Sequence, residues 1–159
     1  MRRRSALAAL AGSGAAFGAE TREPAPDFVG KTIKGEKFSK DSLKGKVVLL
    51  QFWATWCGYC RRDEPAVDTV LRDFSAQGLI VLGVNVRESK EMVLEYLAKH
   101  PRACKVVLTE DTNLTSMVPT NAFPLYILLD REGLVAGIQK GSGGEEMLRR
   151  LLKLVQLER

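Results

Sequence analysis

The chain has 159 residues, of which 45% are hydrophobic and 27% charged, so its length and composition suit one globular domain with a hydrophobic core. Its net charge of +5 falls to +2 without the three arginines at positions 2–4. The excess charge therefore belongs largely to the N-terminus and gives no argument for a basic, nucleic-acid-binding face. No stretch is long and apolar enough for an ordinary membrane-spanning helix.

The N-terminal segment has the pattern of an export signal. The three arginines precede a small, apolar run over residues 6–17, and Ala16 and Gly18 supply the small residues of a cleavage site. We therefore predict a signal peptide over residues 1–19 and one folded domain over residues 20–159. Residues 12–14 (Gly-Ser-Gly) weaken the apolar core, so the alternatives are an uncleaved anchor or a disordered extension, and the match to a twin-arginine signal is poor.

The first half of the domain alternates strand and helix patterns. A proline-bearing lead-in comes before a predicted hairpin, with strands at residues 28–33 and 37–39, and residues 39–45 suit one helical turn closed by glycine. Residues 46–53 and 79–86 are apolar strands. Between and after them, two amphipathic helices are predicted. Their inward residues are Val67, Val70, Leu71 and Phe74 for the first, and Met92, Val93, Tyr96 and Leu97 for the second.

The second half predicts a short strand at residues 105–108 and a weak helical turn at 113–118. Strands at 125–129 and 134–138 are joined by a tight turn. The last helix, residues 144–157, turns Leu148, Leu151, Leu152 and Val155 inward. This alternation predicts an α/β fold with a central mixed sheet flanked by helices, covered on both faces, and a hairpin extension near the N-terminus.

Cys57 and Cys60 form a C-x-x-C pair between the strand that ends at Trp53 and the following helix. A strand that delivers such a pair onto a helix N-terminus is typical of redox sites, because the unpaired amides and the helix dipole there stabilise a thiolate. Two other interpretations stay open. A zinc site would need Cys104 and His100 to converge on the pair, and a structural disulfide across so short a loop would constrain the unfolded chain little.

Three segments resemble the thioredoxin superfamily, and more narrowly its exported TlpA/ResA/CcmG-type thiol–disulfide oxidoreductases, over about residues 26–157. They are the string Phe-Trp-Ala-Thr-Trp-Cys-Gly-Tyr-Cys-Arg at 52–61, the segment Phe-Pro-Leu-Tyr-Ile-Leu-Leu-Asp-Arg-Glu-Gly at 123–133, and the lead-in Pro-Asp-Phe at 26–28 with its hairpin and Leu-Lys-Gly-Lys at 43–46. The resemblance implies a thioredoxin-like fold and a redox-active disulfide between Cys57 and Cys60, without another cofactor.

The resemblance also implies a cis-proline opposite the cysteines. In the family this proline lies six residues before the aspartate of the hairpin turn, which selects Pro124 (before Asp130) over Pro119. A cis bond there would turn the backbone of Phe123 toward the cysteines, where it can pair with an extended substrate segment. The alternative is a trans proline that starts an edge strand.

Departures from the family pattern concern the proton acceptor. Thioredoxins carry a buried aspartate six residues before the first cysteine, where this chain has Gln51, which cannot accept a proton from Cys60. The exported branch often has an acid three residues after the second cysteine, and Asp63 occupies that position. We therefore predict Asp63 as the proton acceptor. The alternatives are that the neighbouring Glu64 has this role or that both acids are ordinary first-turn residues.

Other residues carry weaker predictions. Tyr59 stands where the family usually has proline, and Phe123 is bulkier than the common residue before the cis-proline, which bears on substrate range. Cys104 is predicted to be a buried thiol that behaves as a small hydrophobic residue, and His100 a solvated helix cap.

The resemblance predicts a periplasmic, monomeric oxidoreductase in which Cys57 attacks a substrate disulfide and Cys60 resolves the mixed disulfide with the help of Asp63. Trp56 would shield the pair, and Phe123 and Pro124 would hold the substrate. The family's usual task is reduction of cysteine-bearing clients, including apocytochrome c, with electrons from a membrane or thioredoxin-type donor. The alternatives are a client-binding module without turnover and a thiol peroxidase, for which Thr55 lies too near Cys57.

Overall fold

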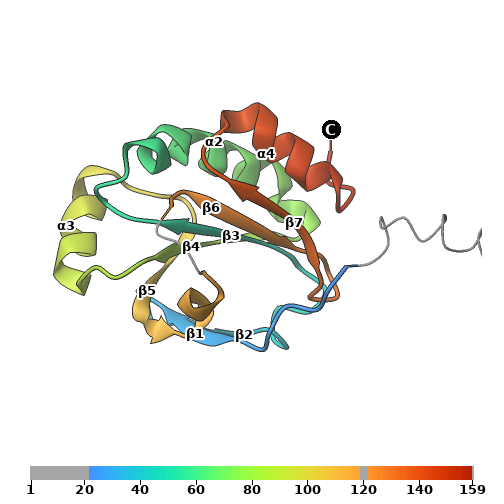
Figure 1. Ribbon diagram of the computed structural model, residues 1–159, viewed down its shortest axis with the longest axis horizontal. Helices are drawn as coiled ribbons and strands as arrows, with labels where there is room; N and C mark the ends of the chain where they lie inside the picture. Colours follow the sequence, from blue (N-terminus) through green and yellow to red (C-terminus); the bar gives the residue numbers. More distant parts are fainter. Residues whose placement is uncertain (1–21, 119–121, 159) are drawn as a thin grey trace, which may run out of the picture.

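A computed structural model describes residues 22–118 and 122–158 of the chain (Figure 1). The predicted signal peptide and Pro119 lie outside these residues. The described part holds seven strands, three α-helices and two short 3-10 helices. They are β1 (Val29–Thr32), β2 (Lys37–Ser39), β3 (Val47–Trp53), α2 (Gly58–Phe74), η1 (Ser75–Gln77), β4 (Leu79–Asn85), α3 (Lys90–Lys99), β5 (Lys105–Thr112), η2 (Leu114–Met117), β6 (Leu125–Leu129), β7 (Val135–Lys140) and α4 (Gly144–Lys153).

The strands form one mixed sheet in the order β2-β1-β5-β4-β3-β6-β7, which confirms the predicted α/β class. β3 is parallel to β4, and β4 is parallel to β5, whereas β6 and β7 form an antiparallel hairpin at one edge and β1 and β2 another at the opposite edge. All seven residues of β3 are buried. The strand that leads into the cysteines is therefore the central one, held by β4 on one side and β6 on the other.

The two faces of the sheet are covered by different kinds of structure (Figure 1). Alternate β3 residues such as Leu49 and Trp53 belong to the same core as the buried residues of α2, α3 and α4. Leu50 and Phe52 point the other way and pack with the lead-in, the β2 strand and η2, through Phe28 and Leu114 among others. α2 and α3 cover the same face of the sheet. Each connects two parallel strands, and both connections move in the same direction along the sheet, from β3 to β4 and from β4 to β5. Because such connections are almost always right-handed, both helices are placed on one face.

Local details differ from the sequence-based expectation. Residues 40–45 form successive turns, closed by Gly45 at φ +89°, with no helix. α4 ends at Lys153, a few residues earlier than predicted, and β5 extends further, to Thr112. On α3, Val93 is buried as expected but Met92 is 51% exposed, because this short helix turns only a narrow stripe toward the sheet. Within the described residues, no helix has the length and apolarity to cross a membrane.

Candidate active site

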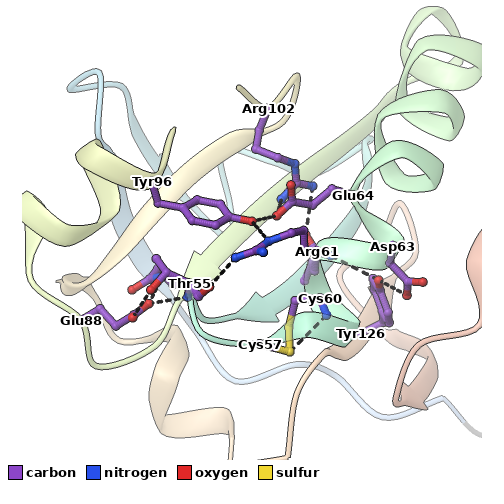
Figure 2. Close-up of a disulfide and its surroundings, with 12 residues drawn as sticks. Thr55, Cys57, Cys60, Arg61, Asp63, Glu64, Glu88, Tyr96, Arg102 and Tyr126 are labelled. Atoms are coloured by element: carbon purple, nitrogen blue, oxygen red, sulfur yellow. Dashed lines mark hydrogen bonds and ion pairs between the residues drawn. A yellow bond between two sulfur atoms is a disulfide. The ribbon is translucent and has the colours of Figure 1, made fainter. Parts of the chain in front are cut away.

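The two cysteines of the C-x-x-C motif are joined as a disulfide at the start of α2, with their Cα atoms 5.3 Å apart (Figure 2). Cys57 is the N-cap of this helix, and its Sγ accepts a hydrogen bond from the amide of Cys60 at 3.1 Å. Cys57 is 5% exposed and Cys60 1%. Both sulfurs are therefore buried in the disulfide, and the first cysteine is placed where helix amides stabilise a thiolate. Their order of reactivity stays a prediction.

The loop between β3 and α2 is held by a neighbouring strand end. β3 and β4 run parallel and finish side by side, with Trp53 opposite Asn85. Just beyond β4, the Glu88 carboxylate accepts hydrogen bonds from the Thr55 amide at 2.7 Å, the Thr55 hydroxyl at 2.5 Å and the Asn85 side chain at 2.8 Å. These three bonds anchor the residue two positions before Cys57. Sequence reasoning missed Glu88, because a glutamate in a polar connection has no pattern that marks it.

The charge around the start of α2 is basic. No acidic residue lies in the first turn, and Arg61 and Arg62 follow Cys60 directly. The Arg61 side chain turns back to donate to the Thr55 carbonyl at 3.4 Å, and Arg62 lies over the Tyr59 ring. Nothing in this turn opposes a negative charge on Cys57.

Aromatic side chains surround the disulfide at the surface. Trp56 is 67% exposed and Tyr59 59% exposed, and the Trp56 ring lies 6.0 Å from that of Phe123, centroid to centroid. The Phe123–Pro124 peptide bond is cis, which confirms the choice of Pro124 from its spacing to Asp130. The structure thus brings Trp56, the residue before Cys57, against Phe123, and Pro124 directly precedes β6, the strand that pairs with β3. Their part in substrate binding stays a prediction.

Asp63 is fully buried, one turn beyond Cys60 on α2. Its Oδ2 accepts a hydrogen bond from the Tyr126 hydroxyl at 2.7 Å, and its Oδ1 accepts one from the amide of Gly144, the first residue of α4, at 3.1 Å. Burial, together with the bond to Asp63, raises the pKa of the Tyr126 hydroxyl far above its ordinary value. Tyr126 therefore stays protonated and donates to the carboxylate.

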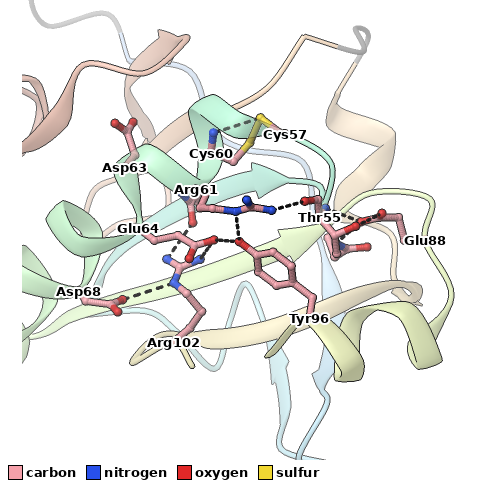
Figure 3. Close-up of polar contacts among 12 residues, drawn as sticks. Thr55, Cys57, Cys60, Arg61, Asp63, Glu64, Asp68, Glu88, Tyr96 and Arg102 are labelled. Carbon is pink, nitrogen blue, oxygen red and sulfur yellow. Dashed lines mark hydrogen bonds and ion pairs between the residues drawn. A yellow bond between two sulfur atoms is a disulfide. The ribbon is translucent and has the colours of Figure 1, made fainter. Parts of the chain in front are cut away.

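Glu64, the alternative acid, points to a different set of partners (Figure 3). Its Oε2 accepts a hydrogen bond from the Tyr96 hydroxyl at 2.6 Å and lies 3.9 Å from Nη1 of Arg102. Because α2 begins at Gly58, both acids lie beyond the first turn, and both are buried with side-chain partners. They are not the ordinary first-turn residues of the alternative interpretation.

Gln51 occupies the centre of the sheet below these acids and is fully buried. Its side-chain amide donates to the Tyr126 oxygen at 3.2 Å, and its carbonyl accepts from Nη2 of Arg102 at 3.1 Å. Sequence reasoning missed both Tyr126 and Arg102. Tyr126 has the pattern of any strand residue, and Arg102 follows a helix-ending proline, where an arginine is usually solvated.

The two remaining predicted residues lie away from the disulfide. Cys104 is a free thiol, 8% exposed, and burial raises its pKa, which agrees with an inert, hydrophobic role. His100 is the C-cap of α3, as predicted, but its ring is half-buried and stacks on Tyr96 with 4.5 Å between centroids. Among the described residues, no group of three or more metal-ligating side chains comes together.

A central strand that delivers a C-x-x-C disulfide to a helix N-terminus, beside a cis-proline from the adjacent antiparallel strand, defines a thioredoxin-like thiol–disulfide oxidoreductase. Residues 21–138 match the model of the AhpC/TSA family, and the chain belongs to this family.

Known relatives agree with this class. The chain is 31% identical over 132 residues to the thiol-disulfide oxidoreductase ResA of Bacillus subtilis (strain 168), covering 83% of this chain and 74% of that protein. It is 32% identical over 139 residues to the thioredoxin-like protein YneN of the same organism, covering 86% and 81%. A crystal structure of a thiol:disulfide interchange protein from Chlorobium tepidum TLS superposes with a TM-score of 0.72 at 27% identity, covering 84% and 96%.

Proposed function

We propose that this oxidoreductase works outside the cytoplasm and reduces disulfides in client proteins. The proposal rests on the position of Cys57 at the N-cap of α2. Its sulfur accepts a hydrogen bond from the amide of Cys60, and the first turn of the helix contains no acidic residue. That setting favours a thiolate, which is the attacking form in disulfide exchange. The likeness to ResA and the basic, apolar segment at residues 2–18 support an extracytoplasmic place of action.

In the reductive direction, the Cys57 thiolate attacks one sulfur of the client disulfide and the client's other sulfur leaves as a thiolate. Cys60 then gives its proton to Asp63 and attacks the Cys57 sulfur, which releases the second client sulfur. Two electrons pass from the cysteine pair to the client, and the pair ends as the disulfide that the structure contains. A reduced donor protein, of the membrane or thioredoxin type, must restore the dithiol.

The client is proposed to lie across Trp56, Phe123 and Pro124. The exposed Trp56 ring offers an apolar surface next to the disulfide, and the cis bond gives the chain a backbone turn beside the cysteines. An extended client segment could hydrogen-bond to that backbone whatever its side chains are. Apocytochrome c, whose cysteines must be reduced before haem attachment, is the client that the family resemblance favours. A monomer is sufficient for this chemistry.

The equilibrium potential of the Cys57/Cys60 couple tests the direction. A value near that of thioredoxin, about −270 mV, is expected from a reductant, whereas a value near −120 mV is that of an oxidant. The measurement equilibrates the protein with dithiothreitol of known redox ratio and follows the dithiol by alkylation. A potential in the oxidant range would contradict reduction and leave the oxidoreductase class intact.

The role of Asp63 has its own test. Asp63→Asn should slow resolution of the mixed disulfide by roughly 10- to 100-fold, in the lower range of general-base effects. The first attack by Cys57 should change much less. Glu64→Gln is the matched control, because it removes the charge of the adjacent buried acid. A loss in Glu64→Gln with none in Asp63→Asn would transfer the role to Glu64.

A further inference from the structure

Arg102 is a buried cation beside the active-site acids for which the mechanism above has no use. Its side chain is only 1% exposed, although it belongs to the connection between α3 and β5. Nε lies 3.5 Å from Asp68 and Nη1 3.9 Å from Glu64, both on α2 (Figure 3). Nη2 donates to the Gln51 carbonyl at 3.1 Å. The guanidinium therefore connects two acids of α2 to Gln51 in the central strand β3.

We infer that Arg102 is a positioning residue for the resolving step, which acts through Gln51 and Tyr126 to keep the Tyr126 hydroxyl donating to Asp63. This inference rests on the proposed role of Asp63 as the proton acceptor. The side chains form one continuous series: Arg102 to Gln51 at 3.1 Å, Gln51 to Tyr126 at 3.2 Å, and Tyr126 to Asp63 at 2.7 Å.

The direction of every hydrogen bond in this series follows from its first member. A guanidinium has donors and no acceptor, so the Gln51 carbonyl must face Arg102. The NH2 group of Gln51 then faces Tyr126 and donates to its oxygen. The single proton of the Tyr126 hydroxyl is left to point at Asp63. With another group at position 102, the Gln51 amide could turn over and the Tyr126 proton could point away from the acid.

Arg102 acts on Asp63 by fixing the direction of the hydrogen bonds between them, and not through its own positive charge. The guanidinium charge lies near the carboxylates of Glu64 and Asp68, so little of its field remains at the far end of the series. The Tyr126 hydroxyl and the Gly144 amide donate to the two different oxygens of Asp63. These two donors hold the carboxyl group of Asp63 in one orientation.

Few other charges surround Asp63. α2 contributes Cys60 and Glu64, and β6 contributes Tyr126, which is protonated. α4 contributes its N-terminal amide, with Glu145 and Glu146 in the first turn on the exposed side of that helix. The Gln51 amide is neutral. The pH dependence of the resolving step should therefore report mainly on Asp63 and Cys60.

The resolving step can be timed with dithionitrobenzoate, whose two halves are released as coloured thiolates. Attack by Cys57 releases the first half and resolution by Cys60 the second, so stopped-flow absorbance separates the two steps. The rate of the second phase is recorded against pH in wild type, Tyr126→Phe, Gln51→Leu and Arg102→Gln. Tyr96→Phe is the matched control, because it removes a part-buried tyrosine hydroxyl from Glu64 and leaves the series to Asp63 intact.

Tyr126→Phe should move the lower midpoint of this profile upward by about one to two pH units, since a hydrogen bond to a charged group is worth about that much. Gln51→Leu and Arg102→Gln should each move it by about half a unit, because the hydroxyl remains but its direction is free. The first phase and the Tyr96→Phe profile should match wild type. If Arg102→Gln fails to fold, Gln51→Leu still tests the same connection.

Three results would overturn different claims. Wild-type profiles in Gln51→Leu and Tyr126→Phe, with slow resolution in Asp63→Asn, would overturn the inference and keep Asp63 as the base. A shift in Tyr126→Phe without any shift in Gln51→Leu would remove Arg102 from the mechanism. An unchanged second phase in Asp63→Asn would instead refute the proposed role of Asp63 itself.

Discussion

Gly83 lies in the middle of β4, between Gln51 on β3 and Val106 on β5, and a side chain there would collide with its neighbours. A Cβ at this position would lie 3.1 Å from Sγ of Cys104 and 3.3 Å from Nε1 of Trp53. Both distances are shorter than the ordinary van der Waals contact of a Cβ, which lies at 3.4–4 Å. Gly83→Ala therefore overpacks the layer directly beside the buried polar series.

The size of the effect follows from two opposing contributions. Overpacking a filled core costs about 1–3 kcal/mol. Replacing glycine by alanine in a strand returns about 0.5–1 kcal/mol, because alanine loses less conformational freedom on folding. Gly83→Ala should therefore lower the free energy of unfolding by about 1–2 kcal/mol. In a Cys104→Ala background the closer of the two contacts is absent, and the same substitution should cost less than about 0.5 kcal/mol.

Urea denaturation of wild type, both single variants and the double variant measures this coupling, with equal m-values as the condition for comparing them. A coupling of about 1 kcal/mol is the expected result. Cys104 would then be a space-filling thiol in contact with Gly83, as its burial indicates. An equal cost of Gly83→Ala in both backgrounds would refute this reasoning and assign the strain to Trp53.

Three further predictions concern the thiols, the turn after β6 and the N-terminus. Limited alkylation of the reduced protein should modify Cys57 before Cys60 or Cys104, and first labelling of Cys60 would contradict this assignment. Cys60→Ser should trap a mixed disulfide with substrate, which Cys57→Ser cannot form. Burial raises the pKa of Asp130, but the Leu134 amide, Arg22 and the Glu132 amide together lower it below the ordinary value. The Asp130 carboxylate therefore stabilises the folded protein at neutral pH and loses this effect on acidification. The difference in free energy of unfolding between wild type and Asp130→Asn should shrink between about pH 5 and pH 3. A difference independent of pH would exclude that contribution. N-terminal sequencing of exported protein should begin near Ala19 or Glu20, and a full-length protein recovered only from the cytosol would contradict export.

The sequence alone was sufficient for the main features that depend on neighbouring residues, although the ends of α4 and β5 and the turns at residues 40–45 differ from the prediction. An apolar run followed by C-x-x-C and a helical pattern places Cys57 at a helix N-terminus, because strand and helix periods and the capping position are local properties. The cis bond before Pro124 was predicted from the family resemblance, which places the cis-proline six residues before the aspartate of the hairpin turn. The strands and their mixed sheet followed from the same kind of pattern.

The surroundings of those residues were decided by the tertiary structure. Tyr126 and Asp63 are 63 residues apart in the chain, and Arg102 and Gln51 are 51 apart. They meet because β6 lies beside β3 and because α2 and α3 are carried to the same face of the sheet. A polar residue in a strand or after a helix has no local signature that names its partner. Only the folded chain shows that Arg102 and Tyr126 both hydrogen-bond to Gln51 and that Tyr126 donates to Asp63. Buried polar groups need such partners because they are withdrawn from water.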